Sequence, residues 1–189
     1  NPGPATTTDS VKQSLMVPDI CPREQEFGDL TQDVLNKITR VVNGESSHDA
    51  VILTGSGTAG VEAALSSVVP ENGKILILDN GAYGKRAETI IQSYGIPHIT
   101  HKLVWGDYPE IENIENIMRN DSKLTHFFFV HHETTTGMLN PMCEFLELCQ
   151  KYEVDSIVDA MSSYAGLPID LQKESIDYLS VSFSKIRAG

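Results

Sequence analysis

The sequence predicts an α/β fold with a mostly parallel sheet and helices on both faces of that sheet. Short apolar runs alternate with amphipathic segments along the chain, which is typical of repeated strand–helix units. Two of the runs, Ile75–Leu78 and Phe127–Val130, are apolar without any alternation, as in strands that are covered on both faces. No linker rich in Gly and Ser divides the 189 residues, so we expect one domain with a sizeable core.

The predicted elements follow one another in a regular order. Apolar residues at helical spacing predict an early helix over Leu30–Val42. The same spacing predicts further helices over Thr58–Val68, Gly84–Tyr94, Glu110–Asn120, Pro141–Tyr152 and Leu171–Ser175. Apolar runs predict strands over Val51–Leu53, Lys74–Asp79, Pro97–Lys102, Thr125–His131, Ser156–Asp159 and Tyr178–Ser182. Ligands of such sheets bind beyond the carboxyl ends of the strands, so the residues after each strand are the candidate site residues.

The composition narrows the range of partners. The chain carries a formal net charge of −12, whereas nucleic acids and anionic membranes bind basic patches, so neither is expected as a main partner. No apolar run approaches the roughly 18 residues of a membrane span, and residues 1–4 lack the pattern of a signal peptide. Cys21, Cys143 and Cys149 are expected as buried free thiols in a reducing, cytoplasmic setting.

A glycine-rich loop follows the first predicted strand and leads into a helix. It reads Gly-Ser-Gly-Thr-Ala-Gly over Gly55–Gly60. Glycines allow a tight turn and the N–H groups of a helix start favour an anion, so the loop indicates a phosphate cradle. The same letters form a G-x-G-x-x-G pattern, and Asp79 ends the next strand, which leaves an NAD-dependent oxidoreductase open. A turn whose small residues serve only packing is the other alternative.

Aromatic and polar residues follow two of the later strands. Tyr83 lies in Asn-Gly-Ala-Tyr-Gly, where its ring would either stack on a planar ligand or form part of a turn. His131 and His132 point to opposite faces of an extended chain, so no metal site is expected there. Thr134 and its neighbours offer hydroxyl and backbone donors at the same sheet edge.

Asp159 ends the fifth predicted strand, and Lys185 follows the sixth. A lone carboxylate at the end of an apolar strand is costly to bury, so Asp159 either meets a cation or several donors or caps the following turn. A lysine in a drier pocket or beside a cation loses pKa and becomes a usable amine nucleophile, whereas a solvated strand-end lysine does not. Ser182 and Lys185 also form an S-x-x-K pattern, but no Lys-Thr-Gly partner occurs.

These parts have a common chemical purpose. A phosphate cradle, an aromatic plate, an acid at a strand end and a lysine make up a pyridoxal phosphate site. The lysine carries the cofactor aldehyde as a Schiff base, and the acid keeps the pyridine nitrogen protonated so that the ring accepts electrons. The sequence therefore indicates pyridoxal 5'-phosphate as the cofactor.

The chain closely resembles the class V, fold-type I aminotransferases. The resemblance is carried in family order by Asn1–Ala5, Asp19–Glu24, Gly55–Thr58, Asn80–Arg86, Glu133–Gly137, Leu139–Pro141 and Val158–Ser163. It implies that Ser56, Gly57 and Thr58 bind the cofactor phosphate, with Ser184 also in reach. It further implies that Tyr83 stacks on the pyridine ring, Thr134 lies near the ring hydroxyl, Asp159 pairs with the pyridinium nitrogen and Lys185 bonds the cofactor.

Within this family the chain is most similar to members that transfer the amino group of 2-aminoethylphosphonate to pyruvate, giving phosphonoacetaldehyde and alanine. The resemblance implies a homodimer and a smaller C-terminal domain that is absent here. Residues 1–189 would then form the cofactor-binding large domain, cut after Lys185, with weak or no transamination of its own. Arg23, Lys85 and Arg86 are available cations, but a solvated surface role is expected for each.

Other functions stay open at this point. Another class V activity, such as alanine–glyoxylate or serine–pyruvate aminotransferase, would use the same residues. The NAD-dependent oxidoreductase would use Gly55, Gly57, Gly60 and Asp79, and it gives Tyr83, Asp159 and Lys185 no shared purpose. A non-catalytic fragment that keeps the fold is the remaining alternative.

Overall fold

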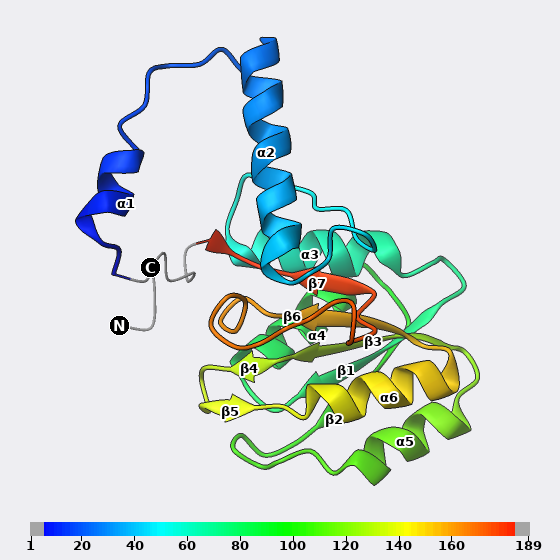
Figure 1. The fold of residues 1–189 in the computed structure, drawn as a ribbon. Coiled ribbons are helices and arrows are strands. Elements are labelled where there is room, and N and C mark those ends of the chain that lie inside the picture. Colours follow the sequence, from blue (N-terminus) through cyan, green and yellow to red (C-terminus); the bar gives the residue numbers. More distant parts are fainter. Residues whose placement is uncertain (1–5, 184–189) are drawn as a thin grey trace.

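A computed structural model describes residues 6–183 of the chain. The helices are α1 Asp9–Ser14, α2 Gln25–Val41, α3 Gly57–Val68, α4 Ala82–Ser93, α5 Ile111–Asn120 and α6 Met142–Tyr152. The strands are β1 Lys74–Asp79, β2 His98–Lys102, β3 Leu124–Val130, β4 His132–Glu133, β5 Met138–Leu139, β6 Asp155–Asp159 and β7 Tyr178–Ser180. A parallel sheet with the order β2-β1-β3-β6-β7 forms the centre of the molecule, as Figure 1 shows.

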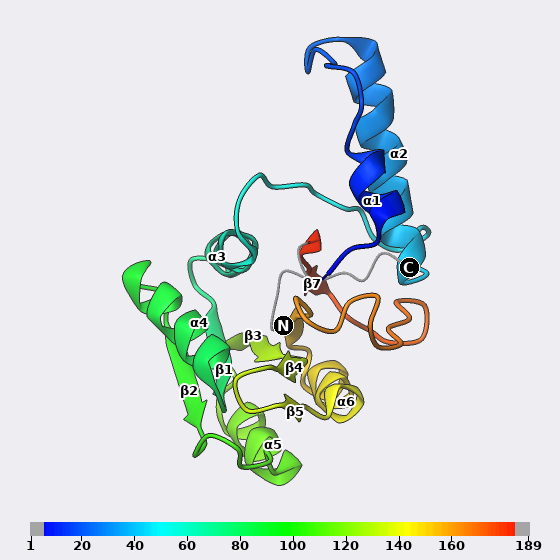
Figure 2. The ribbon, with the colours of Figure 1, turned by 90° about the vertical axis from the view of Figure 1, so that its left-hand side faces the viewer.

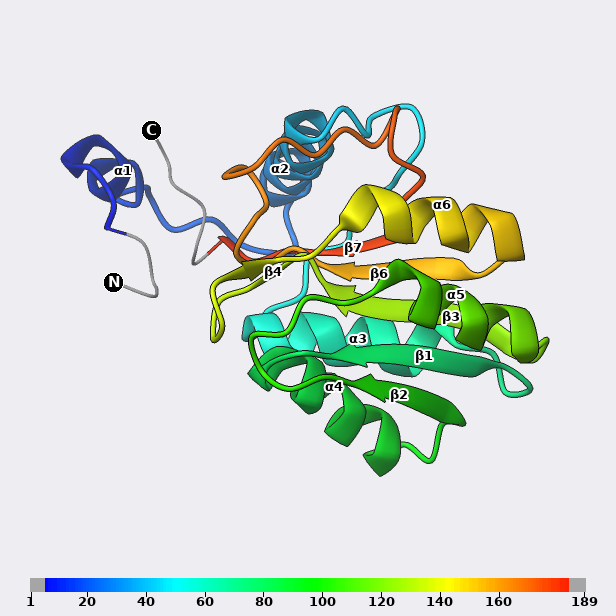
Figure 3. The same ribbon diagram turned by 90° about the horizontal axis from the view of Figure 1, so that it is seen from below.

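Helices cover both faces of this sheet, as the apolar runs predicted. Successive residues of β3 point alternately to the two sides: Phe128 packs with α3 and α4, while Phe127 and Phe129 pack with α5 and α6. Figure 2 shows the two helix pairs on opposite sides of the strands. All three phenylalanine side chains are fully buried, so each face has its own apolar core. The same layered arrangement is seen from below in Figure 3.

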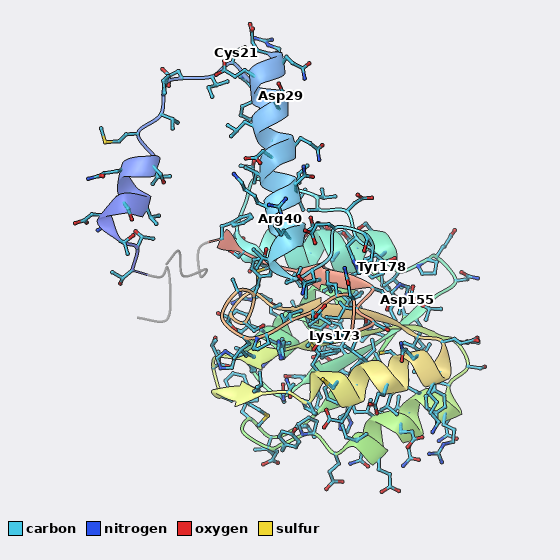
Figure 4. The ribbon with its side chains drawn as sticks, in the orientation of Figure 1. Cys21, Asp29, Arg40, Asp155, Lys173 and Tyr178 are labelled. Carbon is cyan, nitrogen blue, oxygen red and sulfur yellow. The ribbon has the colours of Figure 1, made fainter. Side chains whose placement is uncertain are left out.

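The first two helices project away from the sheet. Figure 4 shows Cys21 and Asp29 at the far end of this projection and Arg40 near the body of the molecule. No residue of α2 is fully buried. The helix joins the body near its C-terminal end, where Ile38 packs on the core and its carbonyl accepts a hydrogen bond of 2.8 Å from the Tyr164 hydroxyl. Among residues 6–183, no helix combines the length and the apolar character needed to cross a lipid bilayer.

Some predicted elements are wrong. Val51–Leu53 is not a strand: the three side chains are exposed, and no described strand pairs with the segment to form the hydrogen-bonded ladder that a strand requires. Leu171–Ser175 is a turn rather than a helix, because the Asp170 carbonyl accepts from the amides of Lys173 and Glu174 and the hydrogen bonding goes no further.

Other predictions need smaller corrections. Helix α2 begins at Gln25 rather than Leu30, and α1, β4 and β5 were not predicted. The predicted burial of the cysteines is confirmed for Cys149 and is wrong for Cys21 and Cys143, which are exposed. The Cys143 and Cys149 positions both lie on α6, as the helical pattern predicted.

Three histidines are expected to make the stability of the fold depend on pH. Burial lowers the pKa of His101, His126 and His131 from the ordinary value of 6.5; His132 adds to this at His131, and Asp155 and Asp177 oppose it at His126. The unfolded chain therefore takes up protons at a pH where the folded chain does not. We expect the free energy of unfolding to fall by up to about 1.4 kcal/mol per histidine per pH unit below about pH 6.5.

Urea unfolding between about pH 7.5 and about pH 5.5, above the pKa of most carboxylates, measures this effect. His126→Gln removes one of the three groups and should flatten the profile. A stability that stays constant over this range, or rises as the pH falls, would contradict the prediction.

Candidate functional site

A cavity of about 150 Å³ lies at the carboxyl edge of the sheet. Parallel α/β sheets bind ligands at this edge, where strand ends and helix N-termini meet. The cavity is bounded by the starts of α3 and α4 and by the ends of β3 and β6. Its walls are Gly57, Thr58, Val61, Tyr83, Arg86, Ala87, Val130, His132, Thr134, Asp159, Met161, Ser162 and Ser182.

The start of α3 forms one wall. Ser56 is the N-cap, and its hydroxyl accepts a hydrogen bond of 3.3 Å from the Ala59 amide. Gly57 and Thr58 follow as the first helical residues, whose amides have no acceptor within the helix. A Cβ at Gly57 would lie 2.8 Å from Met161 Sδ, so glycine allows the loop to approach the β6 end. Ser56 itself lines an adjoining groove rather than this cavity.

The start of α4 forms a second wall and is held by a buried carboxylate. Glu133 is fully buried, and its Oε2 accepts a hydrogen bond of 3.1 Å from the Tyr83 amide. Its Oε1 accepts from the hydroxyl of Thr135 at 2.6 Å and from the amide of the same residue at 3.2 Å. A Cβ at Gly81 would lie 2.3 Å from Glu133 Cγ, so the carboxylate occupies the space that a side chain at 81 would take. Glu133 therefore fixes the helix turn that carries Tyr83.

Asp159 ends β6 and faces the cavity. Its side chain is almost fully buried, with a relative exposure of 4%. Oδ1 accepts a hydrogen bond of 2.9 Å from the Met161 amide. The carboxylate therefore caps the following turn, which is one of the two roles predicted for it from the sequence. A carboxylate carries two acceptor oxygens and no donor when it is ionised. The turn therefore orients a buried acceptor at the cavity wall.

The segment after β3 contributes further polar groups. His132 and Thr134 line the cavity, whereas His131 is buried outside its lining and pairs with Ser163 through Nδ1 and Oγ, 3.0 Å apart. The two histidines thus have different surroundings, as expected for neighbours in an extended chain. The Ser162 hydroxyl donates to the His132 carbonyl at 2.8 Å, which joins the segment to the turn after Asp159.

Most of the predicted site residues come together at this one cavity. Gly57, Thr58, Tyr83, Thr134 and Asp159 all line it, although they come from separate segments of the chain. Ser184 and Lys185 lie outside the described residues. Ser182, two residues before Ser184, lines the cavity.

Two cavity features were missed by sequence reasoning. Arg86 is exposed, as predicted, but it also lines the cavity, which its sequence neighbourhood did not indicate. Its Nη1 lies 3.1 Å from Thr58 Oγ1, and its guanidinium lies over the Tyr83 ring at 5.2 Å from the centroid. The role of Glu133 was also unseen, because it depends on contact with residues that lie far away in the sequence. The sequence spacing could have indicated the position of Arg86, because Arg86 follows Tyr83 by three residues and such residues lie on one side of a helix.

The geometry disfavours the NAD-dependent alternative. Its fingerprint needs a strand directly before the glycine loop, but residues 51–53 form no strand. Asp79, the predicted ribose ligand, does not line the cavity, and burial together with Glu88 raises the pKa of its carboxyl. Binding of a ribose would need an ionised Asp79 carboxylate at the cavity wall, and neither feature of Asp79 meets this need.

Curated relatives match the entire chain. It is 40% identical over 189 residues to 2-aminoethylphosphonate–pyruvate transaminase of Klebsiella pneumoniae subsp. pneumoniae, covering 51% of that protein. It is 39% identical over the same length to the protein of that name from Bacillus cereus, covering 55%. The chain thus spans about half the length of the curated relatives that it matches.

A solved structure and a family model agree with these relatives. Alanine–glyoxylate aminotransferase of Nostoc sp. is 28% identical and superposes with a TM-score of 0.83 over 93% of this chain and 46% of its own. The model of the aminotransferase class-V family matches residues 16–189. The family model covers most of the sequence, and the structure has a parallel sheet with a cavity at its carboxyl edge. The chain therefore belongs to the class V aminotransferase family.

Proposed function

We propose that the cavity binds pyridoxal 5'-phosphate and that the protein transfers the amino group of 2-aminoethylphosphonate to pyruvate. The observation that carries the proposal is the meeting of the α3 start, Tyr83 and Asp159 at one cavity. A helix start suits a phosphate, an aromatic ring suits a planar heterocycle, and a buried carboxylate suits a protonated ring nitrogen. The donor set therefore fits the cofactor.

The substrates are proposed from the relatives. The two curated relatives at 40% and 39% identity bear the name 2-aminoethylphosphonate–pyruvate transaminase. Both names specify an amine donor with a phosphonate and a keto acid as acceptor. The proposal also includes a homodimer in the cytoplasm, with residues 1–189 as the large cofactor-binding domain.

Each residue has a task in the proposed reaction. When bound, pyridoxal phosphate supplies an electron sink for the carbon from which a proton is removed. Gly57 and Thr58 would hold the phosphate with the first amides of α3, and Ser56 and Ser184 would add hydroxyl contacts. Tyr83 would lie against the ring, and Thr134 would bind its hydroxyl.

Asp159 and Lys185 would do the proton chemistry. Asp159 would keep a proton on the ring nitrogen, since a carboxylate in a dry site strongly favours a cation beside it. Lys185 would hold the cofactor by its amine and then move the proton between the substrate carbon and the cofactor carbon. His132 and Ser162 line the same cavity and would help to shield the reacting groups from bulk water.

A second candidate is transamination between alanine and glyoxylate. The specific observation in its favour is the superposition on the Nostoc sp. enzyme of that name at 28% identity. Both candidates require the same cofactor site, so they differ only in the amine donor and the keto acid. The higher identity to the phosphonate enzymes favours 2-aminoethylphosphonate.

Absorbance spectroscopy of the chain with pyridoxal phosphate tests the proposal. We expect a bound-cofactor band, and a single-turnover change of that band on adding 2-aminoethylphosphonate. Alanine, serine and an amine without phosphorus are the comparison donors. A colourless protein that stays colourless with cofactor would refute the proposal, and a response to alanine alone would favour the second candidate.

A further inference from the structure

Arg86 is a cation at the cavity wall that has no carboxylate partner among the described residues. No ion pair joins it to an Asp or Glu among residues 6–183, whereas Lys102 at the end of β2 pairs with Glu88 at 2.9 Å. The guanidinium is held instead by Thr58 and by the face of Tyr83. Of the described residues that line the cavity, Arg86 is the only Lys or Arg. This position concentrates positive charge at the wall formed by α3 and α4.

The contact with Thr58 gives that hydroxyl a direction. Arg86 Nη1 donates to Thr58 Oγ1 at 3.1 Å, because a guanidinium has donors only. The hydroxyl accepts from Arg86 and keeps its own proton for an acceptor. Thr58 is the second residue of α3, so its amide also lacks an acceptor within the helix. Arg86, the Thr58 hydroxyl and the Thr58 amide are then donors that lie next to one another.

The α4 turn that presents Arg86 is also held in place. Tyr83 and Arg86 lie three residues apart on α4, and the Tyr83 amide is bound by the buried Glu133. The ring of Tyr83 lies beneath the guanidinium at 5.2 Å, which restricts its rotation through a cation–π contact. An arginine fixed in this way loses less entropy when it binds an anion than a free surface arginine does.

We infer that Arg86 binds a tetrahedral phosphorus dianion at the start of α3, together with the Thr58 hydroxyl. This inference rests on the proposed function and adds a residue to its site. Planar arginine forks suit phosphoryl and phosphonyl oxygens, and a helix start adds a favourable dipole. The dianion has two possible sources in the proposed reaction, the phosphate of the cofactor and the phosphonate of the substrate.

Arg86→Gln is the test variant, and Lys85→Gln is its matched control. Both remove one positive charge from exposed positions of α4, but Lys85 does not line the cavity. Thermal unfolding checks that both variants fold. Binding of pyridoxal phosphate, of pyridoxal and of inorganic phosphate is measured for each variant and for the unchanged chain. The response of the bound cofactor is then titrated with 2-aminoethylphosphonate and with alanine.

The two sources give different results. If Arg86 binds the cofactor phosphate, Arg86→Gln weakens pyridoxal phosphate binding about ten- to a hundredfold, the effect of one charge-assisted hydrogen bond, and leaves pyridoxal binding unchanged. If Arg86 binds the substrate phosphonate, Arg86→Gln leaves cofactor binding unchanged and lowers the affinity for 2-aminoethylphosphonate by the same factor. The affinity for alanine then stays the same.

Failure of the inference is distinct from failure of the proposed function. Equal behaviour of Arg86→Gln and Lys85→Gln in both cofactor and substrate titrations would overturn the inference while leaving the function intact. Inorganic phosphate that binds the unchanged chain and is lost in Arg86→Gln would support the inference even if pyridoxal phosphate does not bind. An unchanged chain that binds neither pyridoxal phosphate nor inorganic phosphate would overturn both the inference and the proposed function.

Discussion

Replacing Gly84 by alanine is expected to lower the free energy of unfolding by about 3 kcal/mol, near the upper end for overpacked sites. Gly84 lies in the first turn of α4, directly against β1. A Cβ there would lie 2.4 Å from the Leu78 carbonyl oxygen and 2.9 Å from Asp79 Cα. Both atoms belong to the backbone of a strand that pairs with a neighbour on each side, so they cannot move without disturbing the ladder.

Gly28→Ala is the matched control for this substitution. Gly28 lies inside α2, and a Cβ there would have only the flexible Gln25 Nε2 within 4 Å, at 3.9 Å. Alanine is expected to stabilise that helix by up to about 1 kcal/mol, since it has the higher helix propensity. Urea unfolding of both variants measures the difference. A Gly84→Ala protein as stable as the unchanged chain would show that α4 does not pack against β1 as described.

Replacing Asp159 by asparagine is expected to weaken binding of pyridoxal phosphate about ten- to a hundredfold and to slow amino transfer by at least about a hundredfold. Asparagine has nearly the same shape and still accepts from the Met161 amide, so the turn is preserved. It lacks the negative charge that would hold a proton on the ring nitrogen. The variant thus separates the two sequence interpretations of Asp159, a turn cap and a partner of the cofactor.

Asp155→Asn is the control, because Asp155 begins the same strand and Asp159 ends it. Figure 4 shows Asp155 beside Tyr178. The Asp155 side chain is 53% exposed, and its substitution should leave cofactor binding unchanged. Lys185→Ala serves as a reference in which the bound-cofactor band is absent. Cofactor titration and single-turnover absorbance measure the effects, and equal values for the two asparagine variants would leave Asp159 with the turn alone.

The strands of the sheet were predictable because burial on both faces leaves a direct mark on the sequence. Phe127–Val130 and Ile75–Leu78 contain no polar residue that would need contact with solvent. A strand covered on both faces is therefore the structure that suits them best. The same argument located Tyr83 and Asp159, because residues that follow parallel strands meet at one sheet edge. The approximate ends of α3, α5 and α6 were also predictable from their amphipathic spacing.

What the sequence did not reveal depends on long-range contact. Val51–Leu53 has the composition of a strand, but pairing with another strand decides whether it becomes one. The role of Glu133 depends on the α4 start being brought against it, and Tyr83, whose amide it accepts from, lies 50 residues away in the chain. Arg86 reads as a solvated cation until Thr58 and Tyr83 hold it at the cavity.

The close contact between Gly81 and Glu133 constrains how this cavity can change during evolution or engineering. The space that a side chain at 81 would take is already filled by the acidic side chain of 133. A larger residue at 81 is therefore compatible only with a shorter one at 133, and a shorter one leaves the Tyr83 amide without its acceptor. Positions 81 and 133 therefore have to change together, and a change of substrate is more accessible through Arg86 and Thr134, whose side chains line the cavity outside this pair.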